Sequence, residues 1–259
     1  MSLQLAFEAL GDGPPVVVLH GLFGSGRNWR GVAAALAAQH RVLCVDLRNH
    51  GRSPWAASMT YAEMAADVRA LIRSEGLDRP AVIGHSMGGK VAMTLALESP
   101  ESVGRLVVVD IAPVSYGDRL TPYVDAMLSL QPRAGADRAG LARQMLDRIP
   151  DASVVGFLMQ NLTVRDDHFD WRLNLAAIGA AVPGLCDFPP ELAAHRFLGP
   201  TTLITGSLSD HVSPAALAAF AEPFPQLRAV EIEGAGHWVH ADRKTEFVAA
   251  LGLLTRTAA

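Results

Sequence analysis

Several features that mark particular classes of protein are scarce in this sequence. Its two cysteines, Cys44 and Cys186, are too few for a disulfide framework and have no metal-binding spacing. No window of 18 residues is both apolar and free of charge, and the chain does not start with a basic stretch followed by an apolar run. We therefore expect a soluble protein of a reducing compartment, the cytoplasm, without a membrane partner.

Charge of a single sign is also scarce. The formal net charge is −4 and no long basic run is present, so nucleic acid is not expected as a partner. The sequence contains no phosphate-binding loop and no cluster of metal ligands, and we expect neither a cofactor nor a metal. Only Lys90 and Lys244 of the 22 basic residues are lysines. We interpret this arginine bias as compositional rather than functional.

Apolar runs alternate with helical patterns over the first 112 residues. A weak edge strand at 3–9 precedes four strand candidates, at 15–20, 41–46, 81–83 and 106–110, and helical spacing lies between them at 28–38, 61–72 and 90–98. The strand candidates are continuously apolar, which is typical of parallel strands buried on both faces. The pattern predicts one large α/β domain with right-handed crossovers.

The alternation stops after residue 112. Helical segments are expected at about 119–130, 136–148, 151–160 and 170–180, with no convincing buried strand among them. Strands resume at 200–206 and 227–232, with helices at 214–221 and 241–255. The sequence therefore predicts a core made of residues 1–112 and 199–259, with residues 113–198 inserted as a helical cap.

A tight turn of the form Gly-x-Ser-x-Gly connects the strand at 81–83 to the helix at 90–98. Ser86 is at its centre, and Gly84 and Gly88 flank it where side chains would clash with the reversing backbone. Such a turn presents the hydroxyl at the N-terminus of the following helix, where developing negative charge is stabilised. We interpret this strand, turn and helix as a nucleophile elbow with Ser86 as the nucleophile.

A serine nucleophile needs a base, and the base needs an acid that orients it. His237 lies on a glycine-rich loop after the last expected strand, at the sheet edge where Ser86 lies, and is the candidate base. Two aspartates are candidates for the acid. Asp110 ends the strand after the elbow helix, and Asp210 follows the strand at 200–206, which is the usual place in this architecture. Position alone favours Asp210, although one extra residue sets Ser209 where the acid belongs.

Acyl transfer also requires donors for a tetrahedral oxyanion. The expected donors are the backbone N–H of Met87, which follows the nucleophile, and that of Leu22 in the loop after His20-Gly21, with Phe23 beside it. Substrate contacts are expected from a set of apolar residues in the loops and the inserted segment: Phe23, Phe157, Leu158, Met159, Leu162, Trp171, Leu175 and Trp238.

Longer motifs span nearly the whole chain. They are His20 to Ser25, Asp46 to Ser53 with its Asn-His-Gly-Arg-Ser core, Gly84 to Lys90, Val108-Val109-Asp110-Ile111-Ala112-Pro113, Trp171 to Leu175, and Gly236 to Arg243. In these motifs the chain resembles the α/β-hydrolases, within the serine-esterase branch that contains the bacterial esterase YbfF and the eukaryotic abhydrolase-domain 11 proteins.

The resemblance implies an α/β-hydrolase fold, with a mostly parallel sheet of about eight strands, helices on both faces and a helical cap inserted after strand 6. It implies hydrolysis of esters or thioesters without a cofactor. It also implies that Asp110 can be the triad acid, with Ser209 assisting His237, and this moves our preference from Asp210 to Asp110.

The resulting hypothesis is a serine carboxylesterase or thioesterase for short to medium acyl chains, acting through an acyl-enzyme. A carbon–carbon bond hydrolase or an acyltransferase with the same triad is the alternative within the fold. A ligand-binding receptor on a hydrolase scaffold is the alternative of another class. The expected partner is a small-molecule acyl ester or thioester, and we make no prediction of the oligomeric state.

Overall fold

The computed structural model describes residues 2–130, 137–165 and 168–252. Seven of its strands form one sheet in the order β1-β3-β2-β4-β5-β8-β9, in which all neighbours are parallel except the antiparallel β1–β3 pair. The strands are β1 (Phe7–Leu10), β2 (Pro15–Leu19), β3 (Arg41–Val45), β4 (Ala81–His85), β5 (Arg105–Val109), β8 (Thr201–Gly206) and β9 (Leu227–Ile232). The order reverses after β3, and β2 and β4 lie side by side at the centre.

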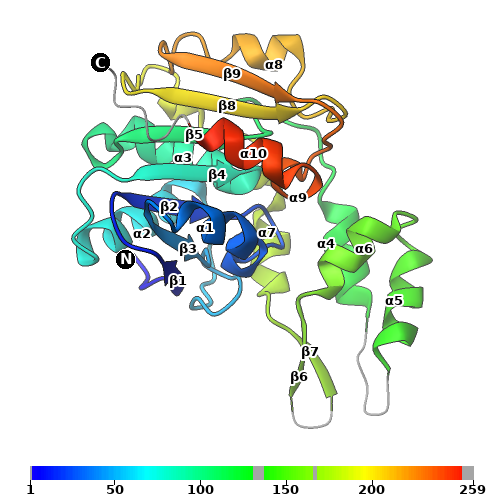
Figure 1. Ribbon diagram of the computed structural model, residues 1–259. Helices are drawn as coiled ribbons and strands as arrows, with labels where there is room; N and C mark the ends of the chain where they lie inside the picture. Colours follow the sequence, from blue (N-terminus) through cyan, green and yellow to red (C-terminus); the bar gives the residue numbers. More distant parts are fainter. Residues whose placement is uncertain (1, 131–136, 166–167, 253–259) are drawn as a thin grey trace.

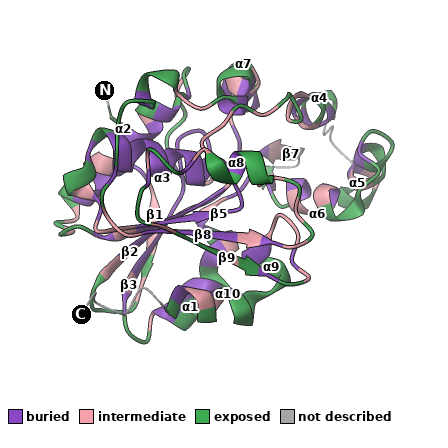
Figure 2. Cartoon of the chain, turned by 90° about the horizontal axis from the view of Figure 1, so that it is seen from above, coloured by how far each residue is buried: buried purple, intermediate pink, exposed green. Residues whose placement is uncertain are grey.

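Helices cover both faces of this sheet (Figures 1 and 2). One face carries α1 (Arg30–Leu36), α9 (Val239–Asp242) and α10 (Lys244–Leu251), and the other carries α2 (Tyr61–Ser74), α3 (Met87–Glu98) and α8 (Pro214–Ala218). Side chains of β2 alternate between the two resulting cores, with Val16 and Val18 in one, and Val17 and Leu19 in the other. Both faces are buried, as the continuous apolar runs predicted.

Among the described residues between β5 and β8 are four α-helices and a hairpin. They are α4 (Thr121–Ser129), α5 (Arg138–Leu146), α6 (Ala152–Met159), β6 (Leu162–Arg165), β7 (His168–Trp171) and α7 (Leu175–Cys186). Figure 1 shows α4, α5, α6 and the hairpin to one side of the sheet, with α7 between them and the sheet. The division into a core and a cap at residues 113 and 198 stays a prediction.

Two expectations for this segment were wrong. The antiparallel pair β6–β7 was missed, and the helix expected from residue 170 begins at Leu175. The reason is local: Leu162 pairs with Trp171 and both are buried, while the side chain of Asn174 accepts a hydrogen bond from Ala177 N and so begins the helix. Residue 136 of the helix expected at 136–148, and residues 253–255 of the one expected at 241–255, lie outside the described residues.

The described sheet has seven strands, against the eight or so that the resemblance implied, and they correspond to the seven strand candidates in the sequence. The inserted segment consequently follows the fifth strand, β5, rather than the sixth. The last helix is divided into α9 and α10 at Arg243, whose φ of −134° and ψ of 58° are not helical. No helix in the described ranges has both the length and the apolar composition needed to cross a membrane.

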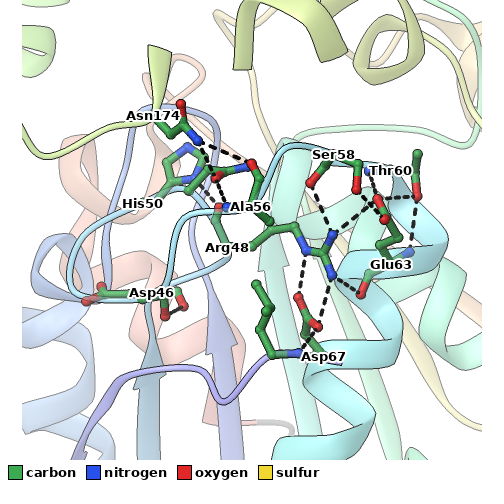
Figure 3. Close-up of polar contacts among 12 residues, drawn as sticks. Asp46, Arg48, His50, Ala56, Ser58, Thr60, Glu63, Asp67 and Asn174 are labelled. Carbon is green, nitrogen blue, oxygen red and sulfur yellow. Dashed lines mark hydrogen bonds and ion pairs between the residues drawn. The ribbon is translucent and has the colours of Figure 1, made fainter. Parts of the chain in front are cut away.

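The loop after β3 is fixed by a buried ion pair (Figure 3). Arg48 Nε donates to Asp67 Oδ2 at 2.7 Å, and the two side chains are 3% and 0% exposed. Asp67 also accepts a hydrogen bond from Leu3 N at 2.6 Å. At the start of α2, Thr60 and Glu63 form a capping box. These contacts hold the loop that carries His50.

The C-terminal end of α7 is held by donors from the sheet side of the molecule. Lys90 Nζ, on the helix after the elbow, donates to Cys186 O at 3.1 Å and to Asp187 O at 2.7 Å. The hydroxyl of Tyr61 donates to Leu185 O at 2.7 Å, and the N–H of Tyr116 donates to Cys186 O at 2.9 Å. Burial lowers the pKa of Lys90 to about 8. An ammonium at a helix C-terminus also interacts favourably with the helix dipole.

Candidate active site

Ser86 has the strained backbone of a nucleophile elbow. Its φ is 52° and its ψ is −120°, a region that residues with a side chain rarely adopt. A Cβ on Gly84 would lie 2.1 Å from Gly88 O, and a Cβ on Gly88 would lie 2.5 Å from His20 O. The turn is tied to the next strand by a hydrogen bond from Ser86 N to Val109 O at 3.0 Å. The two glycines are therefore required by close backbone contacts, as the motif predicted.

Asp110 and His237, 127 residues apart in the chain, form a direct pair. The distance from His237 Nδ1 to Asp110 Oδ2 is 2.7 Å. Asp110 follows β5 with a φ of 52° and is fully buried. It also accepts hydrogen bonds from the Ser209 hydroxyl and from Gly206 N, the latter at 3.3 Å. The carboxylate is therefore fixed from three sides with one oxygen directed at His237.

Asp210, the other candidate for the acid, lies elsewhere. Its side chain is 70% exposed and pairs with Arg119 at 2.8 Å, and its Oδ1 is 3.4 Å from His211 Nδ1. The Arg119 guanidinium holds the pKa of Asp210 below its ordinary value. The structure thus brings Asp110, and not Asp210, into hydrogen-bond contact with His237.

Burial sets the protonation of this pair. It raises the pKa of Asp110 to about 6, an effect that the hydrogen bond from Ser209 opposes. Burial also lowers the pKa of His237 well below its ordinary value, with a further contribution from the neighbouring His211 and His240. The imidazole of His237 is consequently neutral at pH 7 to 8, with Asp110 ionised. In this state Nδ1 donates to the carboxylate and Nε2 is free to accept a proton.

His211 is a further member of this cluster, and the sequence analysis did not identify it as a site residue. Its ring stacks on that of His237, with centroids 3.7 Å apart and an interplanar angle of 13°. Its Nδ1 lies 3.9 Å from Asp110 Oδ2. The position two residues after Ser209 is the signal that could have identified it, because Ser209 itself binds Asp110.

The same three side chains are close enough together to be considered as a metal site. Ligand atoms of Asp110, His211 and His237 all lie within 4.8 Å of one another, although their spacing in the sequence shows no metal pattern. Ligands of one tetrahedral zinc ion are separated by roughly 3.3 Å, given bonds of about 2.0 to 2.2 Å. The 2.7 Å between His237 and Asp110 is instead the length of a charge-assisted hydrogen bond.

His85 and His20 lie close to the elbow and have ring hydrogen bonds that define their roles. His85 Nε2 donates to His237 O at 2.9 Å, and its ring is 4.7 Å from that of His237. It therefore supports the loop that carries His237. His20 donates from Nδ1 to Gly21 O at 2.8 Å and accepts from Leu47 N at 3.0 Å. It therefore fixes the loop that carries Leu22.

The two expected oxyanion donors lie around a small cavity beside Ser86. Leu22, Ser86 and Met87 are among the residues that line this cavity of about 70 Å³. Phe23 N, the neighbouring donor, is engaged by His50 Nε2 at 3.2 Å. That bond favours Leu22 over Phe23 as the second donor.

A larger cavity of about 360 Å³ is also lined by Ser86, and His237 lines it too. Four of the expected substrate contacts line it: Phe23, Phe157, Leu158 and Trp238. The rings of Phe157 and Trp238 are 5.3 Å apart. Trp171 does not line either of these two cavities. Its side chain is buried at the end of the hairpin opposite Leu162, because the strand pairing directs it into the apolar core.

A serine on a strained elbow, a buried aspartate–histidine pair and two cavities meet at one sheet edge. Residues 14–244 match the protein family described as the alpha/beta hydrolase fold. The chain belongs to the α/β-hydrolase fold family. Its sheet order and the position of the elbow at the end of β4 agree with this assignment.

Named relatives of this hydrolase cover nearly its whole length. It is 36% identical to the mouse sn-1-specific diacylglycerol lipase ABHD11, in an alignment that covers 96% of this chain and 84% of the mouse protein. It is 34% identical to the Escherichia coli esterase YbfF, with 92% and 91% covered. The solved structure of a marine microorganism esterase superposes with a TM-score of 0.93 at 32% identity, covering 97% of this chain and 99% of the esterase.

Proposed function

We propose that the protein is a serine hydrolase that cleaves acyl esters or thioesters. The observation that supports this most is the 2.7 Å contact between His237 Nδ1 and the buried Asp110 carboxylate, in a cavity that also contains Ser86. This arrangement turns a weakly nucleophilic hydroxyl into one that attacks an acyl carbonyl and becomes acylated. The related diacylglycerol lipase and esterases act on ester bonds, as their names state.

Each residue has a defined role in this proposal. His237 Nε2 takes the proton of Ser86 Oγ as the oxygen attacks the acyl carbonyl, and Asp110 holds the imidazole in the required tautomer. Backbone N–H groups of Leu22 and Met87 stabilise the oxyanion. As the intermediate collapses, His237 returns the proton to the leaving alkoxide or thiolate. Water then repeats the sequence on the acyl-enzyme and releases the carboxylic acid.

The cavities suggest the size of the substrate. The 70 Å³ cavity is about half of the ~150 Å³ known to hold benzene, so a short acyl chain suits it. The 360 Å³ cavity has room for a longer group and has aromatic walls. We therefore propose substrates with short to medium acyl chains. We also propose residues 113–198 as the cap over this site and, with two free buried cysteines, a cytoplasmic location.

A fluorophosphonate probe tests the mechanism, because it labels only an activated serine. The wild-type chain should be labelled, and Ser86→Ala should not. Ser207→Ala, at a serine whose hydroxyl accepts a hydrogen bond from Gly234 N outside both cavities, is the matched control and should keep the label. Labelling that persists in Ser86→Ala would assign the nucleophile elsewhere. A folded wild-type chain that takes no label would favour a receptor on this scaffold.

A further inference from the structure

A second, polar cavity adjoins the one that contains Ser86. Its volume is about 620 Å³. All of its lining residues except Phe23 and Gly51 have polar or charged side chains. The lining consists of Glu8, Phe23, Ser25, Arg27, Asn28, Arg30, Asp46, Gly51, Arg52, Arg138, Gln160, Asn161 and Arg172. We call this cavity the arginine groove, because five of these residues are arginines.

The positive charge of the groove exceeds its negative charge. Arg30 pairs with Glu8 at 2.8 Å, and Arg52 lies 3.4 Å from Asp46. The Asp46 carboxylate is also engaged by Gly26 N at 2.7 Å. Five arginines and two carboxylates leave the groove at +3, whereas the chain as a whole carries −4. The groove is therefore a local reversal of the molecule's charge.

Three arginines of the groove have no carboxylate partner within the part of the chain that the structure describes. They are Arg27, Arg138 and Arg172. Arg138 donates to Met159 O and Leu162 O, and Arg172 has a long contact of 3.4 Å with Thr163 Oγ1. All three have exposed side chains. Their remaining N–H donors are available to an anion in the groove.

The groove and the Ser86 cavity share a wall. Phe23 and Asn28 line both of them. Asn28 Nδ2 donates to Gln160 Oε1 at 3.0 Å, which connects the two sides of the groove at this wall. A molecule whose acyl group lies at Ser86 can therefore extend past Phe23 and place its far end among the arginines.

We infer that the arginine groove binds phosphate on the leaving group of the substrate. The guanidinium fork matches phosphate oxygens in pairs, and several separated arginines suit a group with more than one anionic oxygen. The volume is in the range of small-molecule sites, and the lining is polar where the Ser86 cavity is largely apolar. This inference rests on the proposed function and narrows its substrates to acyl compounds with a phosphorylated leaving group.

Two thioesters with the same acyl group test the inference. Butyryl-coenzyme A carries phosphates on its leaving group, and the butyryl thioester of N-acetylcysteamine carries none. The measured quantity is the ratio of their kcat/KM values, in the wild type and in Arg27→Gln/Arg172→Gln. The exposed Arg228→Gln on β9, at the opposite edge of the sheet from β1, is the control for loss of a surface arginine outside the groove.

The ratio should fall at least tenfold in the double variant, through KM, and should stay at the wild-type value in Arg228→Gln. It should also fall with added salt, because exposed charges are screened. A double variant whose ratio stays within threefold of the wild-type value would overturn the inference, and so would an equal fall in the control.

The source of the phosphate is resolved by a second pair of substrates, dibutyrylphosphatidic acid and dibutyrylglycerol. A fall confined to the coenzyme A pair assigns a nucleotide thioester, and a fall confined to the lipid pair assigns a phospholipid. If the wild type cleaves none of the four, the proposed function fails. Calorimetric titration of coenzyme A into Ser86→Ala then still tests the groove. Binding that is abolished by adding Arg27→Gln/Arg172→Gln would support the inference, and absence of binding to Ser86→Ala would refute it.

Discussion

Replacing each candidate triad acid by asparagine should lower the rate of hydrolysis by very different factors. In Asp110→Asn the carboxamide occupies the same place but can present an N–H to His237 Nδ1, which holds the imidazole in the wrong tautomer. Loss of a triad acid in this way lowers kcat by about 10⁴-fold. Asp210 and Arg119 are 70% and 61% exposed, so their ion pair is worth about 0 to 1 kcal/mol. Asp210→Asn should therefore change the rate by no more than about fivefold.

The assay is steady-state hydrolysis of p-nitrophenyl butyrate at pH 8, with both variants beside the wild type. The two effects should differ by at least about 10³-fold. An Asp210→Asn variant that loses as much activity as Asp110→Asn would refute the argument. Equal loss would mean that the loop moves during turnover and brings Asp210 to His237.

Thermal unfolding separates lost catalysis from lost folding in Asp110→Asn. The folded pKa of Asp110, about 6, is above its ordinary value of 3.8. Its contribution to stability is therefore fully present below pH 3.8 and is lost as the pH rises through 6. At pH 8 the buried carboxylate is a net cost that asparagine does not have. The inactive variant should consequently unfold at a temperature no lower than that of the wild type.

Three further predictions concern the surroundings of the site. His211→Ala should move the acidic limb of the kcat/KM–pH profile to higher pH, because losing the stacked ring exposes His237 and raises the pKa of His237. His211→Phe keeps a stacked ring and should leave the limb near the wild-type position. Arg48→Met should lower the free energy of unfolding in urea by about 3 to 5 kcal/mol by leaving Asp67 as an unpaired buried charge, and Arg48→Met/Asp67→Leu should recover most of the loss. Gly84→Ala should abolish soluble expression because its Cβ would meet Gly88 O at 2.1 Å, and a well-folded Gly84→Ala would contradict the geometry. Gly156→Ala is the control, because it has open space on an exposed turn of α6, and it should raise the free energy of unfolding by about 1 kcal/mol.

Local chemistry made some features of this molecule predictable. The elbow could be identified because Gly-x-Ser-x-Gly is a short local pattern, in which a Cβ on Gly84 would meet Gly88, four residues further on. The start of α2 could be identified because Thr60 and Glu63 cap one another across three residues. The sheet followed from runs that are apolar on both faces. Each of these features is decided by neighbours in the sequence.

Features that depend on distant residues were less accessible. The Asp110–His237 contact spans 127 residues, and chain position alone favoured Asp210. The β6–β7 hairpin was missed because each strand has four residues, too few for an alternating pattern to be distinguished from a helix. The place of His211 depends on the turn that follows β8. The arginine groove depends on residues 8–52 and 138–172, which are far apart in the chain. No short pattern encodes such assemblies.

The hydrogen bonds that hold the C-terminal end of α7 have a consequence for how substrates are discriminated. The small cavity beside Ser86 is lined by Lys90, Tyr61, Tyr116 and Cys186. Lys90, Tyr61 and Tyr116 donate hydrogen bonds to the last carbonyls of α7. Lifting this end would strip a buried ammonium of its acceptors, so these walls are held in place. In the proposed mechanism, an acyl chain in this cavity therefore meets walls of fixed position. Directed changes of chain-length preference therefore belong at Tyr61 and Tyr116, not in the helices that face the larger cavity.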